Sequence, residues 1–437
     1  MARIWQGHIT KALVVENPST ILDGLLEAEG VQVLRLAHIP SEDDMISIIQ
    51  EHQIQVVFKR SKVRITRKMI ERCPSLLVVQ LCCIGDDSVD KEACAEHGIM
   101  VFNDPISNGR SVVELVIGNL IALSRRLFET NAECREGVWN KNNVERFEVQ
   151  GKVLGVLGLG NIGRAVARTA QALGMQICFF DTRQVSIELG KELGWTFCDS
   201  IDSLFQLSDC VTVHLSAKDV LGHSNQGLIT SEHFAKLGAQ RPKGQRIFIN
   251  FARGFVHTPE DLIAAIESKS IRFAAVDVYP HEPRTQIGWT NPYLNCPQVA
   301  VYPHIGASTQ EAQPRIAQRV CETFTDFSKM GMVRDTPFQP RLLLQLSEVS
   351  KQGKAILAVC HSTVRGTKKA IDEVIFQAGL SNLSSMHKDF DELGFAYDLA
   401  LLDGVLSEED IQSLVANAAE LTGQQDAIRS VRQVSLV

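Results

Sequence analysis

The sequence predicts an α/β protein with two doubly wound parallel-sheet domains and a smaller C-terminal α+β domain of ferredoxin-like order. Three observations lead to this fold class. Short apolar runs alternate with helical patterns over residues 12–102, and the same alternation surrounds a glycine-rich segment at 158–163. Residues 356–436 instead follow the order β-α-β-β-α-β. A chain of 437 residues is long enough for two or three domains with full cores.

The first α/β segment contains two turns that follow predicted buried strands. Its strands are expected at 12–15, 31–36, 56–58, 76–81 and 100–102. Arg60, Ser61 and Lys62 follow the third strand, and Ile84 and Gly85 follow the fourth. Loops at the carboxyl ends of parallel strands often hold ligands, so both turns are candidate binding loops. The alternatives are a solvated basic turn and a plain tight turn.

A long helix is expected at 111–126, where Ser111 and Glu114 have capping-box spacing. We place the crossover into the second domain here. Residues 134–149 are polar, include Trp139, and are expected to form a covering loop.

The glycine-rich segment has the spacing of a dinucleotide-binding fingerprint. A buried strand at 153–157 leads into Gly158, Gly160 and Gly163, a helix follows at once, and the next strand ends on Asp181. The glycines allow a tight turn, close approach of a pyrophosphate and close helix packing, and the helix N-terminus favours phosphate. Asp181 favours NAD over NADP because its charge would repel a 2′-phosphate, although Arg183 leaves an opening for NADP. The alternative is a glycine-rich turn without a ligand.

Three residues at later strand ends have the chemistry that reduction of a 2-keto acid requires. Arg253 can hold a carboxylate with its planar fork, and His304 can donate or accept a proton near neutrality. Glu282 can orient the imidazole and stabilise its protonated form. Each has a plain alternative: a surface arginine, a turn glutamate and a capping histidine.

The last third of the chain contains a predicted linker and the ferredoxin-like domain. A helix at 310–327 should return the chain to the first domain, and Pro337 and Pro340 mark a linker at 335–345. Strands are expected at 356–361, twice within 383–402 and at 428–436, with helices at 367–377 and 408–421.

Composition excludes several classes of protein. The net charge is −7, which provides no electrostatic footprint for nucleic acid or an anionic membrane. We find no signal peptide and no apolar run of membrane-spanning length. The eleven cysteines are scattered, as in reduced cytoplasmic proteins, so we expect a cytoplasmic protein with no disulfide framework and no metal site.

On these motifs the chain resembles the D-2-hydroxyacid dehydrogenase family, and within it the bacterial-type phosphoglycerate dehydrogenases with a C-terminal ACT domain. The resemblance covers nearly the whole chain. It is most specific at 102–111, 137–141, 158–163 and 303–313. It implies two Rossmann-like domains, of which the first is discontinuous. The implied domains are a substrate-binding domain at 1–107 and 306–336, an NAD-binding domain at 108–305 and an ACT-like regulatory domain at 346–437.

The resemblance also implies roles for individual residues. The catalytic set is Arg253, Glu282 and His304. The cofactor-binding set is Gly158, Gly160, Asn161, Ile162, Gly163, Asp181, His214, Ala252, Asp277, His304 and Gly306. The substrate-binding set is Arg60, Ser61, Lys62, Ile84, Gly85, Asn108 and Lys141.

The implied activity is NAD-dependent oxidation of D-3-phosphoglycerate to 3-phosphohydroxypyruvate, the first step of L-serine biosynthesis, with 2-ketoglutarate reduction as a further activity. The family implies a homo-oligomer, most simply a homotetramer. The alternatives are a dehydrogenase for another D-2-hydroxy acid, such as a hydroxypyruvate reductase, and a nucleotide-sensing scaffold of the same fold.

The chain departs from the family pattern at three places. His214-Leu215-Ser216 replaces a His-x-Pro, and extra residues lie between Lys236 and Ile247. In the ACT-like domain, the segment 361–366 lacks the Asn and Pro of the effector loop, and a later Asn corresponds to Ser381. The departures in the ACT-like domain predict that L-serine is a poor effector.

Overall fold

The computed structural model describes residues 2–219, 222–241, 244–283, 288–340, 343–346 and 353–436. The chain divides into two compact units. Unit 1 contains residues 1–107 and 313–437, and unit 2 contains residues 108–312. Part of the extra segment between Lys236 and Ile247, and part of the stretch before residue 353, lie outside the described residues.

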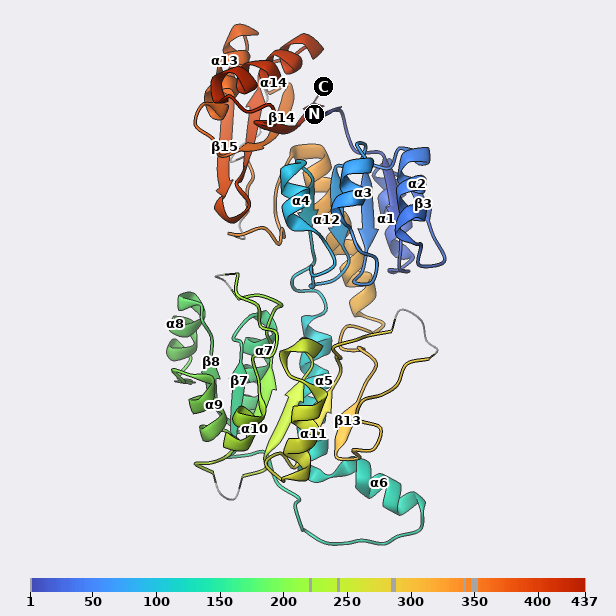
Figure 1. Ribbon diagram of the computed structural model, residues 1–437, viewed down its shortest axis with the longest axis vertical. Coiled ribbons are helices and arrows are strands. Elements are labelled where there is room, and N and C mark those ends of the chain that lie inside the picture. Colours follow the sequence, from blue (N-terminus) through green and yellow to red (C-terminus); the bar gives the residue numbers. More distant parts are fainter. Residues whose placement is uncertain are drawn as a thin grey trace. The chain divides into compact units, whose positions relative to one another are not determined.

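Unit 1 begins with a parallel sheet of five strands in the order β3-β2-β4-β5-β6 (Figure 1). The strands are β2 (Lys11–Val14), β3 (Gln32–Arg35), β4 (Val56–Lys59), β5 (Val78–Leu81) and β6 (Met100–Phe102). The helices are α1 (Ile21–Ala28), α2 (Glu42–His52), α3 (Arg67–Arg72), α4 (Lys91–Glu96) and the late helix α12 (Ala312–Met330). Side chains from α12, including Val320 and Phe324, belong to the same core as β4 and β5, so the returning helix completes this layer.

Unit 2 contains a parallel sheet of seven strands in the order β13-β12-β11-β10-β7-β8-β9. The strands are β7 (Val153–Leu157), β8 (Gln176–Phe180), β9 (Thr196–Phe197), β10 (Cys210–Val213), β11 (Ile247–Asn250), β12 (Phe273–Val276) and β13 (Val299–Val301). The helices are α5 (Gly109–Arg125), α6 (Leu127–Arg135), α7 (Asn161–Ala172), α8 (Gln184–Glu192), α9 (Ile201–Leu207), α10 (Ser231–Lys236) and α11 (Pro259–Glu267), with a 3₁₀ turn η1 (Gly254–Val256).

Two separate cores cover the faces of this sheet. One core joins it to α5 and α7, and the other joins it to α9, α10 and α11. The strand order reverses between β7 and β10, which is the switch point where ligands of doubly wound sheets bind.

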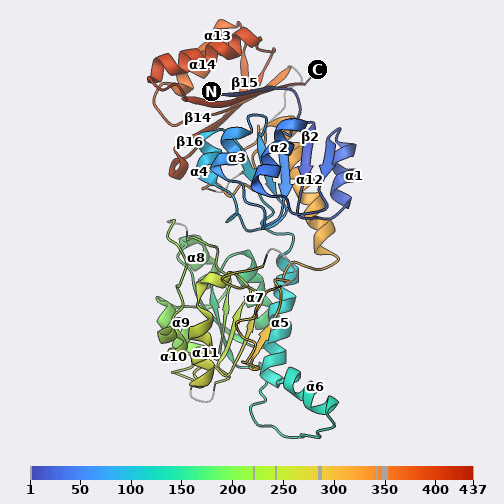
Figure 2. The same cartoon turned by 45° about the vertical axis from the view of Figure 1, so that its right-hand side comes forward.

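The third sheet belongs to unit 1 and has the order β1-β17-β14-β16-β15. Its members are β1 (Arg3–Gln6), β14 (Ala355–Ser362), β15 (Asn382–Phe390), β16 (Phe395–Leu402) and β17 (Ile428–Ser435). The helices α13 (Thr367–Gln377) and α14 (Glu408–Thr422) cover one face (Figure 2), and a short 3₁₀ turn η2 (Asp391–Leu393) lies between β15 and β16. The β-α-β-β-α-β order and the antiparallel pairing of β14, β15, β16 and β17 confirm the predicted ferredoxin-like arrangement.

The N-terminal strand β1 is an addition that the sequence pattern did not predict. It pairs parallel to β17, with Arg3 opposite Ser430. The buried Arg3 guanidinium donates to four backbone carbonyls of the first sheet's layer, at Ile70, Cys73, Leu76 and His97. The first and third sheets of unit 1 therefore share polar contacts, and a single hydrophobic core runs through both.

One helix boundary differs from the expectation. The helix α5 begins two residues before Ser111, with Asn108 at its N-cap, so Ser111 is not a capping residue. The Ser111 hydroxyl instead lies 2.9 Å from Thr309 Oγ1. Arg126 then adopts a left-handed conformation (φ 55°), which ends α5 and separates it from α6.

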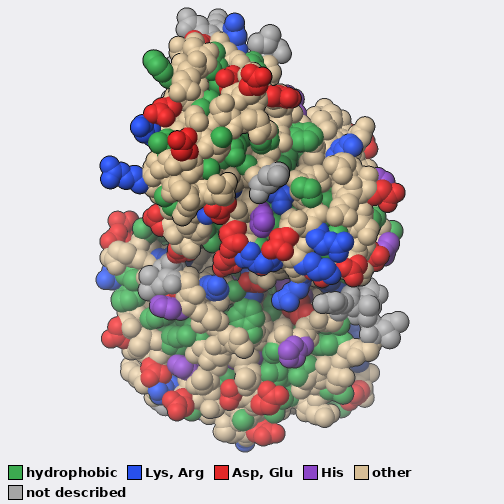
Figure 3. Space-filling model, turned by 45° about the horizontal axis from the view of Figure 1, so that its top comes forward, with side chains coloured by type: hydrophobic (Ala, Val, Ile, Leu, Met, Phe, Trp, Pro, Cys, Tyr) green, Lys and Arg blue, Asp and Glu red, His purple; other side chains and the backbone are tan. Residues whose placement is uncertain are grey.

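Charged side chains of both signs are mixed on the face shown in Figure 3. Among the described residues, no helix is long and apolar enough to cross a membrane.

Candidate active site

The nucleotide loop connects β7 to α7 at the switch point of the unit 2 sheet. Gly158 has φ +92°, and a Cβ there would lie 2.7 Å from the His214 carbonyl oxygen, so the ends of β7 and β10 approach closely. A Cβ on Gly163 would lie 2.1 Å from the Gly158 carbonyl oxygen. Both positions therefore require glycine, as the fingerprint predicts.

The first turn of α7 is open to an anion. Gly160 is the N-cap and provides no side chain to the first amides of the helix, which include those of Asn161, Ile162 and Gly163. These amides and the helix dipole would hold a pyrophosphate, so the loop fits the dinucleotide that the sequence predicts.

Asp181 lies at the end of β8, where a ribose would bind. It is 8% exposed, and its Oδ2 accepts hydrogen bonds from the Leu159 amide (2.7 Å) and from Arg183 Nη2 (2.9 Å). Burial opposes ionisation, but the hydrogen bonds from Arg183 and the Leu159 amide hold the pKa of Asp181 below its ordinary value. The carboxylate is thus charged and oriented toward the glycine loop.

His304 and Glu282, which the sequence predicts to act as an acid–base pair, lie in direct contact. His304 Nδ1 lies 2.9 and 2.8 Å from the two carboxylate oxygens of Glu282. This contact places the proton on Nδ1 and leaves Nε2 with its lone pair in the neutral ring. His304 has φ 56°, an uncommon conformation for a residue with a side chain, and its side chain is 49% exposed. The ring is therefore both oriented and accessible.

Asp277 holds the loop that carries His304. Its Oδ1 accepts from the Ile305 amide and its Oδ2 from the Gly306 amide, each at 2.7 Å. Burial raises the pKa of Asp277, and the two amide hydrogen bonds oppose that rise. The family resemblance assigns this residue to the nicotinamide carboxamide, and the structure gives it a clear second task in positioning the His304 loop.

The turn that carries Arg253 is fixed by Asn250, which the sequence analysis did not select. Asn250 Oδ1 accepts from the Ala252 amide (3.0 Å), and its Nδ2 donates to the Arg253 carbonyl (2.9 Å). A Cβ on Gly254 would lie only 2.0 Å from the Tyr279 carbonyl carbon. Glycine at this position therefore lets the Arg253 turn pack directly against the backbone of Tyr279, which is three residues before Glu282 in the sequence. An Asn at the end of a strand and a Gly after a candidate Arg were the signals available in the sequence.

His214 follows β10 on the other side of the switch point. Its Nε2 lies 3.0 Å from Thr212 Oγ1, and burial lowers the pKa of His214 to about 3. The ring is therefore neutral at physiological pH.

Unit 1 contains the predicted basic turn and the predicted glycine turn. The amides of Lys62 and Val63 donate to the Glu16 carboxylate, which fixes the turn while the Ser61 and Lys62 side chains stay exposed. The Ile84 carbonyl accepts from Asn103 Nδ2 at 2.6 Å, which anchors the segment before Gly85.

The two remaining substrate candidates lie in unit 2. Asn108 is 8% exposed, and its Oδ1 has no hydrogen-bond partner among the described residues. Lys141 lies in an exposed loop after α6. The buried Oδ1 of Asn108 can accept a hydrogen bond from a ligand. Lys141 is exposed, and its position in the loop does not indicate a ligand contact.

Comparison with known proteins assigns the class. The family described as D-isomer specific 2-hydroxyacid dehydrogenase, NAD binding domain, matches residues 117–306. The chain belongs to the D-isomer-specific 2-hydroxyacid dehydrogenase family, and it is an NAD-dependent dehydrogenase.

Similar curated proteins carry a more specific name. The D-3-phosphoglycerate dehydrogenase of Escherichia coli K12 is 32% identical, over 82% of this chain and 83% of its own length. D-3-phosphoglycerate dehydrogenase 1 of Saccharomyces cerevisiae is 30% identical, over 97% of this chain and 87% of its own length.

Solved structures agree on the fold. A 2-hydroxyacid dehydrogenase from Ketogulonicigenium vulgare has a TM-score of 0.61 and 26% identity, covering 77% of this chain and 98% of its own. A glyoxylate reductase from Paecilomyes thermophila has a TM-score of 0.64 and 23% identity, covering 75% of this chain and 98% of its own.

Proposed function

We propose that the protein oxidises D-3-phosphoglycerate to 3-phosphohydroxypyruvate with NAD, the reaction that opens L-serine biosynthesis. The observation that carries the proposal is the His304–Glu282 pair, oriented at the carboxyl end of a sheet with an intact nucleotide loop. The curated relatives at 30% and 32% identity, which are named D-3-phosphoglycerate dehydrogenases, support this substrate over other 2-hydroxy acids.

The residues have separate tasks in this reaction. Arg253 holds the substrate carboxylate with its planar fork and polarises the C2 oxygen. Nε2 of neutral His304 accepts the proton of the C2 hydroxyl, and Glu282 stabilises the imidazolium that forms. NAD, when bound, accepts the hydride that leaves C2. In the reverse direction His304 returns its proton to the carbonyl oxygen.

We assign the substrate phosphate to the basic turn of Arg60, Ser61 and Lys62, and further substrate contacts to Ile84, Gly85, Asn108 and Lys141. The exposed Ser61 and Lys62 side chains, on a turn whose backbone Glu16 holds, support the phosphate assignment. Reduction of 2-ketoglutarate, which carries a carboxylate in place of the phosphate, is a further activity that we propose for the same site.

We also propose that the protein is a homo-oligomer, most simply a homotetramer, that works in the cytoplasm. None of the side chains of α6 is buried, and exposed apolar residues gather in and after it: Leu127, Phe128, Val138, Trp139 and Val144. None of the eleven cysteines, all of which lie in the described part of the chain, forms a disulfide, as in a reducing compartment. Light scattering of the purified chain would measure the subunit number, and a monomer at micromolar concentration would contradict the assembly.

A substrate panel tests the proposed reaction. With NADH, 3-phosphohydroxypyruvate should be reduced with a higher kcat/KM than hydroxypyruvate, glyoxylate or 2-ketoglutarate. In Arg60→Gln the KM for the phosphorylated substrate should rise, while the KM for hydroxypyruvate stays nearly unchanged. Arg64→Gln, an exposed arginine beyond the turn, is the matched control.

Two results would contradict the proposal. Equal losses on phosphorylated and unphosphorylated acids in Arg60→Gln would remove the phosphate assignment. Tight NADH binding with no turnover of any acid would favour a nucleotide-sensing scaffold.

A further inference from the structure

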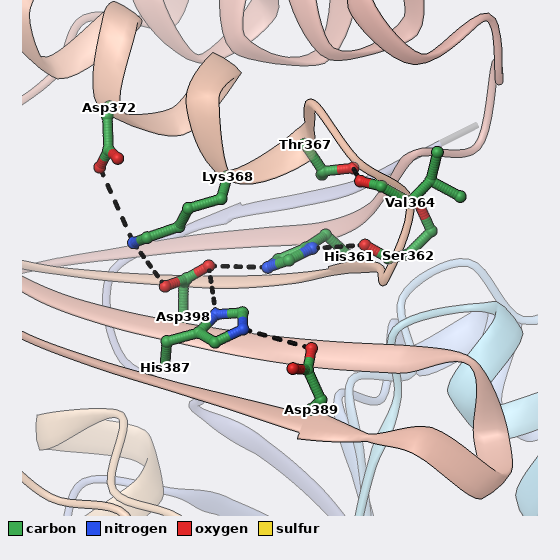
Figure 4. A network of polar contacts seen from close by, with 9 residues as sticks. All are labelled: His361, Ser362, Val364, Thr367, Lys368, Asp372, His387, Asp389 and Asp398. Atoms are coloured by element: carbon green, nitrogen blue, oxygen red, sulfur yellow. Dashed lines mark hydrogen bonds and ion pairs between the residues drawn. The ribbon is translucent and has the colours of Figure 1, made fainter.

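The third sheet carries a cluster of two histidines and an aspartate that has no part in the proposed reaction. His361 comes from β14, Asp398 from the neighbouring β16 and His387 from β15 on its other side. His387 lies directly opposite Asp398 in the strand register, and His361 lies two positions beyond Val359, the other cross-strand partner of Asp398. Strand pairing therefore brings the three side chains together beneath α13 (Figure 4).

The inner atoms of the cluster converge on one carboxylate oxygen. Asp398 Oδ2 lies 2.7 Å from His361 Nε2 and 3.1 Å from His387 Nδ1. One ligand atom from each of the three residues lies within 4.8 Å of the other two. Two imidazole nitrogens and a carboxylate oxygen are a donor set that Zn²⁺ prefers.

The outer nitrogen of each imidazole already has an acceptor. His361 Nδ1 lies 2.7 Å from the Ser362 carbonyl oxygen, and His387 Nε2 lies 3.2 Å from Asp389 Oδ1. A neutral ring that donates its outer N–H to these groups presents an inner lone pair toward Asp398. Histidines that bind a metal almost always donate their other N–H to a carbonyl or carboxylate in this way.

Each ring faces an oxygen acceptor at both of its nitrogens. A cation among the inner atoms would therefore be attracted by the Asp398 carboxylate and by the lone pairs that the two rings present to it. Lys368, Asp372 and Asp389 are the other charged groups around the cluster.

We propose that His361, His387 and Asp398 form a binding site for a divalent zinc-class metal ion. Zinc bonds to nitrogen and oxygen are about 2.0–2.2 Å long, which places tetrahedral ligands roughly 3.3–3.5 Å apart. The separation from Asp398 Oδ2 would have to open by about 0.7 Å for His361 Nε2 and by about 0.3 Å for His387 Nδ1 to reach that geometry. The side chain of His387 is 36% exposed, whereas those of His361 and Asp398 are 3% and 4% exposed. An ion and a fourth ligand from water therefore enter on the His387 side.

Lys368 adjusts the affinity of this site. Its ammonium lies 2.7 Å from Asp398 Oδ1 and thereby orients the carboxylate so that Oδ2 faces the histidines. Its positive charge also opposes a cation nearby. Removing that charge in Lys368→Met should strengthen metal binding, which a merely structural cluster would not show.

The test uses the full chain freed of metal by a chelator. Titration with Zn²⁺ should show one site per chain that His387→Gln weakens at least tenfold. Co²⁺ should give the intense visible absorption of a four-coordinate ion in the wild type but not in His387→Gln. Thermal unfolding should shift upward with Zn²⁺ in the wild type alone, and Lys368→Met should bind Zn²⁺ more tightly.

Two further variants serve as controls. His223→Gln removes an exposed histidine that also contacts a carboxylate, Asp219, and His304→Gln removes the histidine beside Glu282. Both should retain the site. Absence of saturable Zn²⁺ binding in the wild type would overturn the proposal. Equal affinity in the wild type, His361→Gln and His387→Gln would also overturn it.

Discussion

At the scale of single residues, the pairing of Glu282 with His304 makes a direct prediction about catalysis. Replacing His304 by Gln removes the proposed proton acceptor, and general acid–base catalysis is worth about 10²- to 10⁴-fold in rate, so kcat should fall by that range. Glu282→Gln keeps an acceptor near Nδ1 but loses the charge that stabilises imidazolium, so kcat should fall less, by roughly 10- to 100-fold. The measurements are kcat and the Kd for NADH. A drop in NADH affinity that matches the drop in kcat would show that these residues position the cofactor instead.

Gly254 provides a second prediction at the residue scale. In Gly254→Ala the new Cβ would meet the Tyr279 backbone at 2.0 Å, so the Arg253 turn must move. Overpacking of this kind costs about 1–3 kcal/mol, and we expect the free energy of unfolding to fall by that amount, with kcat reduced further because Arg253 is displaced. Gly118→Ala is the matched control, since nothing lies within 4 Å of a Cβ there and the position is inside α5. The control should be neutral or stabilised by about 0.5–1 kcal/mol. Equal effects of the two substitutions on unfolding would contradict this account.

The site was predicted from the sequence best where local chemistry demands a residue type. Gly158, Gly163 and His304 were identifiable because a phosphate loop and a proton transfer each require those residues. Asn250 was missed because its role consists of two hydrogen bonds to its own turn, which leave no spacing pattern. The third-sheet cluster of His361, His387 and Asp398 was missed because it depends on strand register, and we expected no metal site from the cysteines alone.

At the scale of elements, the strands were predictable where apolar runs are long enough to form a buried strand. All seven strands of the unit 2 sheet are parallel, and the runs at 153–157, 247–250 and 273–276 lie in its centre. The strand β1 was not predictable, because Arg3–Gln6 has one buried residue in four and joins a sheet whose other strands all lie after residue 354. The helix α6 was not predicted, because none of its side chains is buried and it therefore shows no apolar stripe; the loop expected at 134–149 overlaps only its last two residues.

The turn after β10 carries His214, which predicts how the stability of the protein depends on pH. Since burial lowers the pKa of His214 to about 3, the folded protein resists protonation there, while the unfolded chain takes up a proton near pH 6.5. The contribution of His214 to stability is therefore neutral above pH 6.5 and becomes increasingly unfavourable as the pH falls from 6.5 toward 3. The loss is at most about 1.4 kcal/mol per pH unit, and partial exposure of the side chain reduces it.

Urea unfolding at pH 7, 6 and 5 would measure this effect in the wild type and in His214→Gln. The variant should lose less stability between pH 7 and pH 5 than the wild type does. Buried His257, whose pKa burial also lowers, is present in both proteins and cancels in the comparison. Parallel pH dependences would contradict the assignment to His214.

The loop between β14 and α13 predicts a weak response to L-serine. Thr363 and Ser381 stand where the resemblance places two Asn side chains, and a hydroxyl offers fewer hydrogen bonds than an amide. His361 is 2% exposed, and both its ring nitrogens already face acceptors, so it cannot readily bind an amino acid. Each lost hydrogen bond to a charged end costs about 1–3 kcal/mol, and we expect millimolar L-serine to inhibit little or not at all. Steady-state rates with and without L-serine test this, and strong inhibition at micromolar serine would show that other groups hold the effector.

At the scale of the whole molecule, unit 1 combines two sheets of different class into one folding unit. Its core includes Phe58 and Phe324 of the parallel layer together with Tyr397 and Leu401 of the ferredoxin-like sheet. Two buried arginines connect the two sheets of unit 1, and the acceptors of their hydrogen bonds are backbone carbonyls, not carboxylates. Arg432 donates to the Phe327 and Ser328 carbonyls at the end of α12, as Arg3 does to carbonyls around α3 and α4. A ferredoxin-like layer joined in this way should unfold together with the parallel sheet of unit 1.

Arg3→Met tests that coupling. The substitution keeps an unbranched apolar stem but removes the Arg3 donor from four backbone carbonyls, of which that of Cys73 still accepts from the Leu76 amide. Each carbonyl that is left unsatisfied costs about 1–3 kcal/mol before water or relaxation compensates. We therefore expect unit 1 to lose roughly 3 kcal/mol of stability or more, and hydrogen exchange to accelerate in β5, β6 and β17 together. Exchange in β7 and β8 of unit 2 should stay unchanged, and so should NADH binding, because Arg3 contacts neither. The matched control is Lys11→Met, which also removes one positive charge, from a half-buried lysine in β2, the next strand along the chain. This variant should leave all these exchange rates near their wild-type values. If Arg3→Met accelerated hydrogen exchange in β17 alone, the two sheets of unit 1 would unfold separately. The hydrophobic core that they share would then not make them one cooperative folding unit.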